Sequence, residues 1–454
     1  MVKENVSAVT GPADLRDFMH SLSEVMEQVD TQIFREDTFE RRISRRFTKR
    51  EVAAFLGVDV TFLAHGAKGD ADLFPNGQRS GREVTFSAEE VGIIRALLGS
   101  KTRLKRDHIH WRQPGDPLKV IAFGALKGGT GKTLSSAHFA QYLALAYGLR
   151  VGVIDSDPQA TCSLYFAGDD MDVFSETSRT VIDFMGLAAL DGKPHVLPVA
   201  ADQDAIWQQT PWPGLRMIPG GMDIMNGDMA LMQMVQGGNS RIYAALSEAL
   251  DHWSKAHPPK TTAADLRRED GSFDLDRYQA ALVETLDVIV IDQQPSMTFM
   301  QMCGAVAADS LVVPMTMKGF DLSTLSVYAS SLASYLDVIS EADPDFGFGT
   351  GDHFVLPSIV QGDNEKDVFQ IADLRAHGGD MMAQVWYDRS AAVANASEQY
   401  MSIYEYTPPD GRKVSAKTFL ENANAVNDYI VTRALPHLPD RSFAAQFISD
   451  RWGE

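Results

Sequence analysis

The fold is decided by the stretch Leu126-Lys127-Gly128-Gly129-Thr130-Gly131-Lys132-Thr133. It follows an apolar run over residues 120–125, which predicts a buried parallel strand, and precedes residues 134–143, which predict a helix. A strand, a glycine-rich loop, Gly-Lys-Thr and a helix are the context of a phosphate-binding loop. Glycines there let backbone N–H groups turn toward phosphate oxygens, and the helix N-terminus adds partial positive charge. We therefore expect Lys132 to contact the outer phosphates of a nucleotide and the Thr133 hydroxyl to bind Mg²⁺.

Carboxylates follow two other segments that predict buried strands. Asp155 ends the apolar run 150–155, with Asp157 two residues later, and Asp292 ends the run 287–292. Ligands bind at the carboxyl ends of strands in open parallel sheets, so we expect these carboxylates near the phosphate-binding loop. Asp155 and Asp292 are candidates for holding Mg²⁺ through water, and Asp157 for orienting an attacking water. Without the loop upstream, two aspartates after a strand would more often form a cap or a turn.

The loop departs from the usual pattern in one place. Leu126 stands where a leading glycine is usual, and a second lysine, Lys127, precedes Gly-Gly. Lys-Gly-Gly-Thr-Gly-Lys-Thr resembles the deviant Walker A motif of the ParA/MinD group of ATPases. Residues 155–159, Asp-Ser-Asp-Pro-Gln, match that family's Asp-x-Asp-Pro-Gln motif, and Asp292 stands in place of its Walker B aspartate. Gln294 replaces the first proline of the family's usual Asp-x-Pro-Pro. A glycine-rich turn that binds nothing is the alternative.

The resemblance covers most of residues 119–435 and implies a slow, partner-stimulated ATPase with ATP and Mg²⁺ as cofactors. The implied nucleotide-binding residues are Lys127, Gly128, Gly129, Thr130, Gly131, Lys132, Thr133 and Leu134, and the implied metal site is Thr133, Asp155 and Asp292. Lys127 is expected to cross a dimer to the partner's nucleotide, so Lys127, Lys132 and Asp157 are the expected catalytic residues. In partition ATPases an arginine at the position of Arg389 helps to bind nonspecific DNA. A surface ion pair is the alternative for Arg389, because Ala392 replaces a second arginine found in some members.

The N-terminal region carries the outline of a helix-turn-helix. Thr48 and Glu51 form a capping box ahead of an apolar helix face, Gly57 permits a sharp turn, and Asp59 can cap a second helix. Residues 75–86 predict a turn and a β-wing, and residues 87–97 another helix. The pattern resembles the MerR-like winged helix-turn-helix ahead of the ATPase in the larger ParA/SopA/RepA partition proteins. The candidate DNA-binding residues are Lys49, Arg50, Thr61, Arg79 and Arg82. A small helical domain used only for dimerisation is the alternative.

Charge supports this division of the chain. Residues 1–119 carry 19 Lys and Arg against 18 Asp and Glu, whereas the remainder carries 22 against 43. Phosphate neutralisation dominates nucleic-acid affinity, so the N-terminal region is the expected main contact with DNA. We expect a helical arm over residues 1–44, a winged helix-turn-helix domain over 45–113 and an ATPase domain over 114–454. The apolar stripe of the arm fits pairing with a second subunit and packing on its own domain equally well.

The predicted fold is α/β, with a doubly wound, mostly parallel sheet after the N-terminal helices. No apolar run is long enough to span a membrane, and the N-terminus has no apolar stretch of the kind that a signal peptide needs. Residues 443–452 are mildly amphipathic but carry balanced charge, which favours packing on the body over membrane targeting. We therefore expect a cytoplasmic, nucleoid-associated protein without membrane contact.

The sequence favours a partition ATPase that binds ATP in a homodimer. Its expected partners are an operator through the N-terminal domain, nonspecific DNA when ATP is bound, and a ParB-like centromere-binding protein. One alternative is a sequence-specific transcription repressor that uses nucleotide only as an effector. Another is a different member of the deviant Walker group, either a membrane-site placing ATPase or an iron protein whose Cys162 and Cys303 would share a cluster across a dimer.

Overall fold

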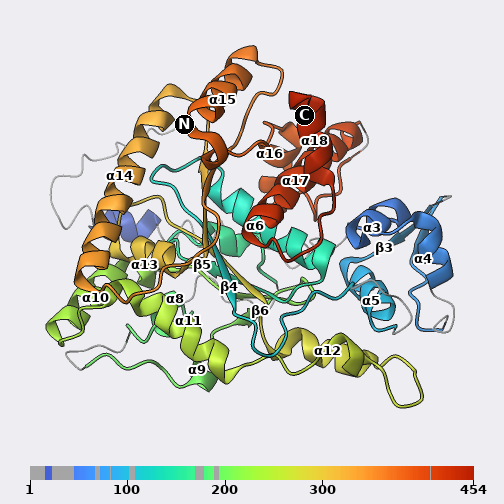
Figure 1. The fold of residues 1–454 in the computed structure, drawn as a ribbon, viewed down its shortest axis with the longest axis horizontal. Helices are drawn as coiled ribbons and strands as arrows, with labels where there is room; N and C mark the ends of the chain where they lie inside the picture. The colour runs from blue at the N-terminus through green and yellow to red at the C-terminus, as the bar shows by residue number, and fades with distance from the viewer. Residues whose placement is uncertain are drawn as a thin grey trace, which may run out of the picture.

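A seven-stranded sheet lies at the centre of the computed structural model (Figure 1). The structure describes residues 16–22, 45–66, 72–81, 83–101, 108–168, 178–188, 194–409 and 411–453. The strands are β4 (Lys119–Phe123), β5 (Val151–Asp155), β6 (Gln208–Gln209), β7 (Leu215–Ile218), β8 (Val288–Asp292), β9 (Ser310–Met315) and β10 (Phe354–Pro357). Their order in the sheet is β10-β9-β4-β8-β5-β7-β6, and every pair is parallel except β6 with β7. The predicted doubly wound, mostly parallel sheet is therefore confirmed.

Alternate residues of the central strands enter two different cores. In β4, Ile121 and Phe123 pack into one core, whereas Val120 and Ala122 pack into the other. The first core includes residues of α6 (Lys132–Tyr142) and α17 (Lys413–Ala434), and the second includes residues of α11 (Ala245–Ala256) and α13 (Phe299–Ala307). Helices thus cover both faces of the sheet, as is usual for parallel sheets. The edge formed by the carboxyl ends of the strands is therefore where we expect a ligand to bind.

The N-terminal elements occur in the predicted order. They are β1 (Phe47–Thr48), α3 (Lys49–Leu56), α4 (Val60–Gly66), β2 (Gln78–Ser80), β3 (Glu83–Phe86) and α5 (Ala88–Gly99). The strands form a small antiparallel sheet of order β1-β3-β2. Thr48 and Glu51 form the predicted capping box, and the Asp59 carboxylate accepts a hydrogen bond from the amide of Thr61 at 2.7 Å. Of the predicted arm, residues 16–22 are helical, and the rest lies outside the described residues.

These N-terminal elements pack against the far end of the helix that follows the phosphate-binding loop. Residues Leu143–Tyr147 continue α6 as a π-helical turn. The Arg95 guanidinium of α5 donates to the carbonyl of Leu145, and Arg441 donates to the carbonyls of Ala146 at 3.0 Å and Leu56 at 3.3 Å. Hydrophobic residues of both regions belong to one continuous core. The N-terminal elements therefore pack on the body through a shared hydrophobic core and hydrogen bonds, and are not joined to it by a linker alone.

Two C-terminal segments, residues 386–390 and 443–452, can be compared with their predicted structures. The resemblance to the family predicts a late strand over residues 386–390 and the start of a helix over 392–396. The helix is present as α16 (Ala391–Ser397), but the strand prediction is wrong. The amides of Tyr387 and Arg389 donate to the carbonyls of Pro357, the last residue of β10, and of Val360 beyond it, so the segment forms one isolated bridge and no regular ladder. The helix α18 (Phe443–Trp452) packs on the body, with the rings of Phe447 and Trp386 5.0 Å apart. Among the described helices, none combines the length and apolarity that crossing a bilayer would need.

Candidate functional site

The glycine-rich loop connects β4 to α6 in a conformation that depends on glycine. Gly129 and Gly131 have φ angles of +74° and +85°, which L-residues with a side chain rarely adopt. The helix α6 begins at Lys132, directly after Gly131, so its free N–H groups face the loop. The hydroxyl of Ser358, just beyond β10, donates to the carbonyl of Thr130. The loop is therefore held at the carboxyl edge of the sheet, between β4 and the end of β10.

Lys132 lies inside this loop and is almost completely buried, with 6% of its surface exposed. Its ammonium donates to the carbonyl of Lys127 at 3.0 Å. Burial lowers the pKa of Lys132, while the carboxylates of Asp292 and Asp157 oppose that shift. The lysine is thus positioned at the centre of the curled loop, where the negative charge of a phosphate group would offset the cost of its burial.

Two buried carboxylates lie side by side at this edge. Asp155 and Asp292 are register partners on the adjacent strands β5 and β8. Burial and, to a smaller extent, the neighbouring charge of Asp155 together raise the pKa of Asp292 to about 8. Burial likewise raises the pKa of Asp155 to about 6, although hydrogen bonds from Ser163 and Asp157 oppose this. Two acids held together in a dry site do not both ionise readily, and a bound cation would stabilise their charged forms.

The two carboxylates differ in their remaining bonding capacity. Asp155 accepts the amide and hydroxyl of Ser163, both at 2.8 Å, and the amide of Asp157 at 3.1 Å. Asp292 accepts the Thr133 hydroxyl at 2.8 Å, but its buried Oδ1 has no partner among the described residues. An orphaned carboxylate oxygen beside a threonine hydroxyl fits Mg²⁺, which takes few protein ligands when phosphates supply others. No group of three acidic, histidine or cysteine side chains suited to a metal occurs in the described ranges.

Asp157 lies at the edge of the same site and is half-buried. Its Oδ1 accepts the amide of Gln159 at 2.9 Å, so the residue also stabilises the turn after β5. The loop after β8 is stabilised in a similar way. Gln294, which stands where proline was expected, donates through its amide to the Thr298 hydroxyl at 2.7 Å and so ties the loop to the start of α13. A hydrogen bond therefore supplies part of the rigidity that the missing proline would give.

Lys127 has a partner that the sequence did not predict. Its ammonium forms an ion pair with Asp321, a buried residue at the start of α14 (Gly319–Ala342), and the Thr316 hydroxyl donates to the same carboxylate. The Lys127 side chain is 42% exposed. Nothing in the sequence marks Asp321, because it is 194 residues from Lys127 and belongs to no recognisable motif. In this structure Lys127 is therefore held within its own subunit.

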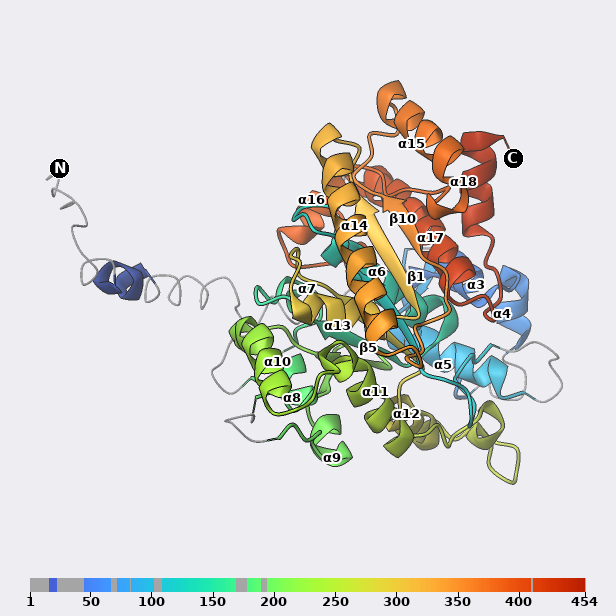
Figure 2. The same ribbon diagram turned by 60° about the vertical axis from the view of Figure 1, so that its left-hand side comes forward.

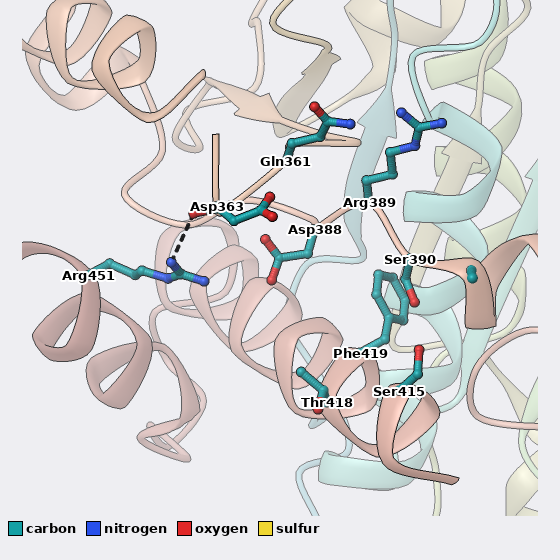
Figure 3. A pocket seen from close by; sticks show the side chains of 11 residues that line it. Gln361, Asp363, Asp388, Arg389, Ser390, Ser415, Thr418, Phe419 and Arg451 are labelled. Carbon is teal, nitrogen blue, oxygen red and sulfur yellow. Dashed lines mark hydrogen bonds between the residues drawn. The ribbon is translucent and has the colours of Figure 1, made fainter. Parts of the chain in front are cut away.

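A pocket of about 550 Å³ opens beyond Ser358 (Figure 3). Its lining consists of Gln361, Gly362, Asp363, Asp388, Arg389, Ser390, Ala391, Ser415, Thr418, Phe419 and Arg451. The Asp388 carboxylate points into it, and burial raises the pKa of this group. The Arg389 side chain points away from Asp388, and Arg451 donates to the Gly362 carbonyl at 3.3 Å (Figure 3). Of these residues, only Arg389 was singled out from the sequence.

The candidate DNA-binding residues fall into two groups. Lys49 and Arg50 are exposed in the first turn of α3, Thr61 in the first turn of α4 and Arg79 on β2. Arg82 lies outside the described residues. Arg389 is exposed beside the pocket on the ATPase body, so it does not belong to the same group as the N-terminal residues.

The sheet and the loop define a P-loop nucleotide-binding protein. Residues 121–399 match the family described as CobQ/CobB/MinD/ParA nucleotide binding domain. The chain belongs to this family. The parallel sheet and this family match together confirm the α/β fold that the resemblance to the ParA/MinD group implied.

Several relatives resemble most of the chain. A putative replication protein A of Rhizobium rhizogenes is 25% identical over 392 residues, which are 86% of each chain. Protein SopA of Escherichia coli strain K12 is 26% identical over 377 residues, 82% of this chain and 84% of SopA. A solved structure described as Partition Protein superposes with a TM-score of 0.52 at 15% identity, covering 84% of this chain and 95% of that one. At that identity the superposition speaks for the fold alone.

Proposed function

We propose that this chain is an ATP-dependent DNA partition protein. The observation that carries the proposal is the convergence of Lys132, Thr133 and Asp292 at a loop that also presents Lys127. The names of its relatives, among them SopA and the chromosome partitioning protein ParA of Caulobacter vibrioides, point to the same function.

In the proposed reaction, water attacks the γ-phosphorus of ATP, the bond to the β–γ bridging oxygen breaks, and ADP and phosphate leave. The backbone of residues 128–134 and the Lys132 ammonium hold the phosphates. Thr133 and Asp292 would hold Mg²⁺, which would neutralise phosphate charge, and Asp155 adds negative charge beside them. Asp157, at the open side of the site, orients the attacking water.

The pocket beside Asp388 is suited to the base of the nucleotide. The first residue of the pocket lining, Gln361, is three residues after Ser358, which donates to the phosphate-binding loop at Thr130. At most roughly 10 Å of chain therefore separates the pocket from that loop. The Asp388 carboxylate already accepts the Trp386 indole N–H at 2.9 Å through Oδ1. When ionised it only accepts hydrogen bonds, so its other oxygen favours a base that presents an N–H group. The Phe419 side chain supplies an apolar surface in the same pocket.

The dimer follows from the charges at the site. Two triphosphates brought face to face repel one another unless cations lie between them. Lys127 of each subunit supplies that charge once it leaves Asp321. Two Arg389 residues in one dimer then act together on DNA, which raises affinity beyond that of a single patch.

Further partners complete the proposal. The N-terminal elements recognise an operator and repress the protein's own operon, and a ParB-like centromere-binding protein stimulates hydrolysis. A cytoplasmic, nucleoid-associated location follows from the binding of DNA. The proposed domains are those expected from the sequence, namely residues 1–44, 45–113 and 114–454.

The test is ATP hydrolysis measured with Mg²⁺, random DNA and the partner protein. We expect Lys132→Ala and Asp157→Ala to lower the rate at least tenfold, and only Lys132→Ala to weaken nucleotide binding as well. Lys119→Ala, at the amino end of β4, is the matched control. Full activity in both site variants would reject the site.

Two alternatives are separated by simple measurements. Operator binding that is tight and indifferent to ATP, without ATP-dependent binding to random DNA, would favour a repressor. The iron protein is disfavoured because Cys162 and Cys303 are both fully buried, so neither reaches a surface where a dimer would share a cluster.

A further inference from the structure

A row of methionines lies exposed along one side of α10 and of the short turn that precedes it. Residues Met222–Asn226 form a 3₁₀ turn that leads into α10 (Gly227–Gln236). Met222, Met225, Met229 and Met232 recur at steps of three and four residues and are 63%, 65%, 63% and 45% exposed. We call these four residues the methionine face. The element lies at the periphery of the molecule in both views (Figures 1 and 2).

The opposite side of the same element is also apolar. Ile224, Leu231 and Met234 are buried in the core on that side, with 2% or less of their surface exposed. A helix that is apolar on two opposite sides is normally buried on both. One side of this helix already contacts the body, so the methionine face is the side left for another molecule to cover.

Charge around the methionine face indicates the kind of molecule. No lysine or arginine occurs between Arg216 and Arg241, whereas Asp223 is exposed and Asp228 is half-buried. Arg241 is already engaged, with Glu248 and Asp343 each 2.9 Å away. Two copies of this chain meeting face to face here would bring acidic groups together, which disfavours self-association.

We infer that the methionine face is the docking site for a cationic amphipathic helix of another protein. Methionine side chains are flexible and polarisable, so they adapt to the apolar side of such a helix. Lysine and arginine at the margins of that helix would meet the aspartates. The docking site does not depend on the proposed ATPase activity.

Hydrogen bonds connect the segment that carries the methionine face to the regions that follow β5 and β8, the strands that end in Asp155 and Asp292. The Gly220 amide, two residues before Met222, donates at 2.9 Å to the hydroxyl of Ser163, which itself donates to Asp155. Asp228 accepts the amide of Met300, in the first turn of α13, at 2.9 Å. A helix docked on the methionine face would therefore contact an element that is itself hydrogen-bonded to Ser163, a partner of Asp155, and to Met300, in the helix that follows Asp292.

The experiment uses the full-length protein with ¹³C-labelled methionine methyl groups. The probe is an 18-residue peptide of leucine and lysine that forms an amphipathic helix, and the control peptide has the same composition in shuffled order. We expect the probe alone to shift the methyl signals of the methionine face, each assigned by single substitution. The triple variant Met222→Gln/Met225→Gln/Met229→Gln should bind the probe at least tenfold more weakly.

Met381→Gln is the matched control, because Met381 is 65% exposed outside this face. It should leave binding unchanged. An unchanged thermal unfolding midpoint of the triple variant verifies that it folds. Equal binding of both peptides, or undiminished binding by the folded triple variant, would overturn the inference. Methyl shifts that depend on protein concentration without any peptide would overturn it in favour of a second copy.

Discussion

The buried pair Asp155 and Asp292 makes the stability of the protein depend on pH. An acid whose pKa is raised in the fold keeps its proton while the unfolded chain loses it. The pKa of Asp292 is raised from 3.8 to about 8, so unfolding free energy should fall as pH rises across that interval, and below pH 4 this contribution should be fully present. The decrease should be on the order of a few kcal/mol.

Thermal unfolding between pH 5 and 9 measures this effect. Asp292→Asn should flatten the curve between about pH 6 and pH 8, while the exposed control Asp345→Asn should not. Mg²⁺ with nucleotide should also flatten it, because the cation stabilises the ionised carboxylate. A pH profile identical in wild type and Asp292→Asn would mean that Asp292 carries no unusual proton.

The ion pair between Lys127 and Asp321 should oppose dimerisation. Lys127 has to leave Asp321 before it can contact a partner's phosphate, and a charge-assisted hydrogen bond contributes about 1.5–3 kcal/mol. Asp321→Asn should therefore lower the dissociation constant of the ATP-bound dimer about tenfold or more. Lys127→Ala should abolish that dimer and leave nucleotide binding intact.

Sedimentation with and without ATP measures both effects. Asp309→Asn is the matched control, because Asp309 pairs with Lys119 at 2.9 Å at the opposite end of β4. It should leave the dimer unchanged. A dimer that persists in Lys127→Ala would remove the proposed role of this lysine.

At the scale of elements, the contact between α5 and the π-helical end of α6 depends on a glycine. Gly148 has φ +66°, and a Cβ there would lie 2.4 Å from the Arg95 side chain. Gly81 has a similar φ of +62° with open space around it. Gly81→Ala should cost roughly 1–2 kcal/mol of backbone strain, and Gly148→Ala roughly 1–3 kcal/mol more from displacing Arg95.

Chemical denaturation of both variants measures the difference. Equal losses would mean that Arg95 moves aside at no cost. A larger loss at Gly148 should be accompanied by weaker operator binding, because Arg95 also donates to the carbonyl of Phe55 in α3, at 3.5 Å.

Sequence patterns were sufficient where local chemistry decides the structure. The buried strands, the capping box at Thr48, and the loop with its positive-φ glycines follow from residues close in sequence. Asp321 and the pocket beside Asp388 depend on contacts between distant segments and were missed. The late strand was predicted wrongly from the family resemblance, because only Trp386 and Tyr387 of residues 386–390 are buried and the segment makes an isolated bridge in place of a regular ladder.

For the whole molecule, the distribution of charge predicts how DNA binding responds to salt. The body is strongly acidic, so its proposed contact with DNA would depend on few cations and on their pairing in the proposed dimer. Binding to random DNA should require ATP and should fall steeply with salt, with a log–log slope of about −0.9 per phosphate contacted. Operator binding should persist without ATP at low salt.

Titrations on random and operator fragments at several salt concentrations provide the measurement. Arg389→Ala should weaken ATP-dependent binding to random DNA and reduce the slope, whereas Arg268→Ala, exposed on a distant loop, should not. Random-DNA binding that is equally tight without nucleotide would contradict the coupling between ATP and DNA.

The helix α6 begins at the phosphate-binding loop and, through its π-helical turn, ends under α5. The eleven residues of α6 form a rod about 16 Å long, and the π-helical turn extends it to the contact with Arg95 of α5, so a small tilt at one end should move the other. The two ends of this continuous helix therefore contact the proposed nucleotide site and the proposed DNA-binding elements. We therefore expect a nucleotide bound at the loop to shift α5 and the proposed operator-binding helices directly, because they pack on the end of the same helix.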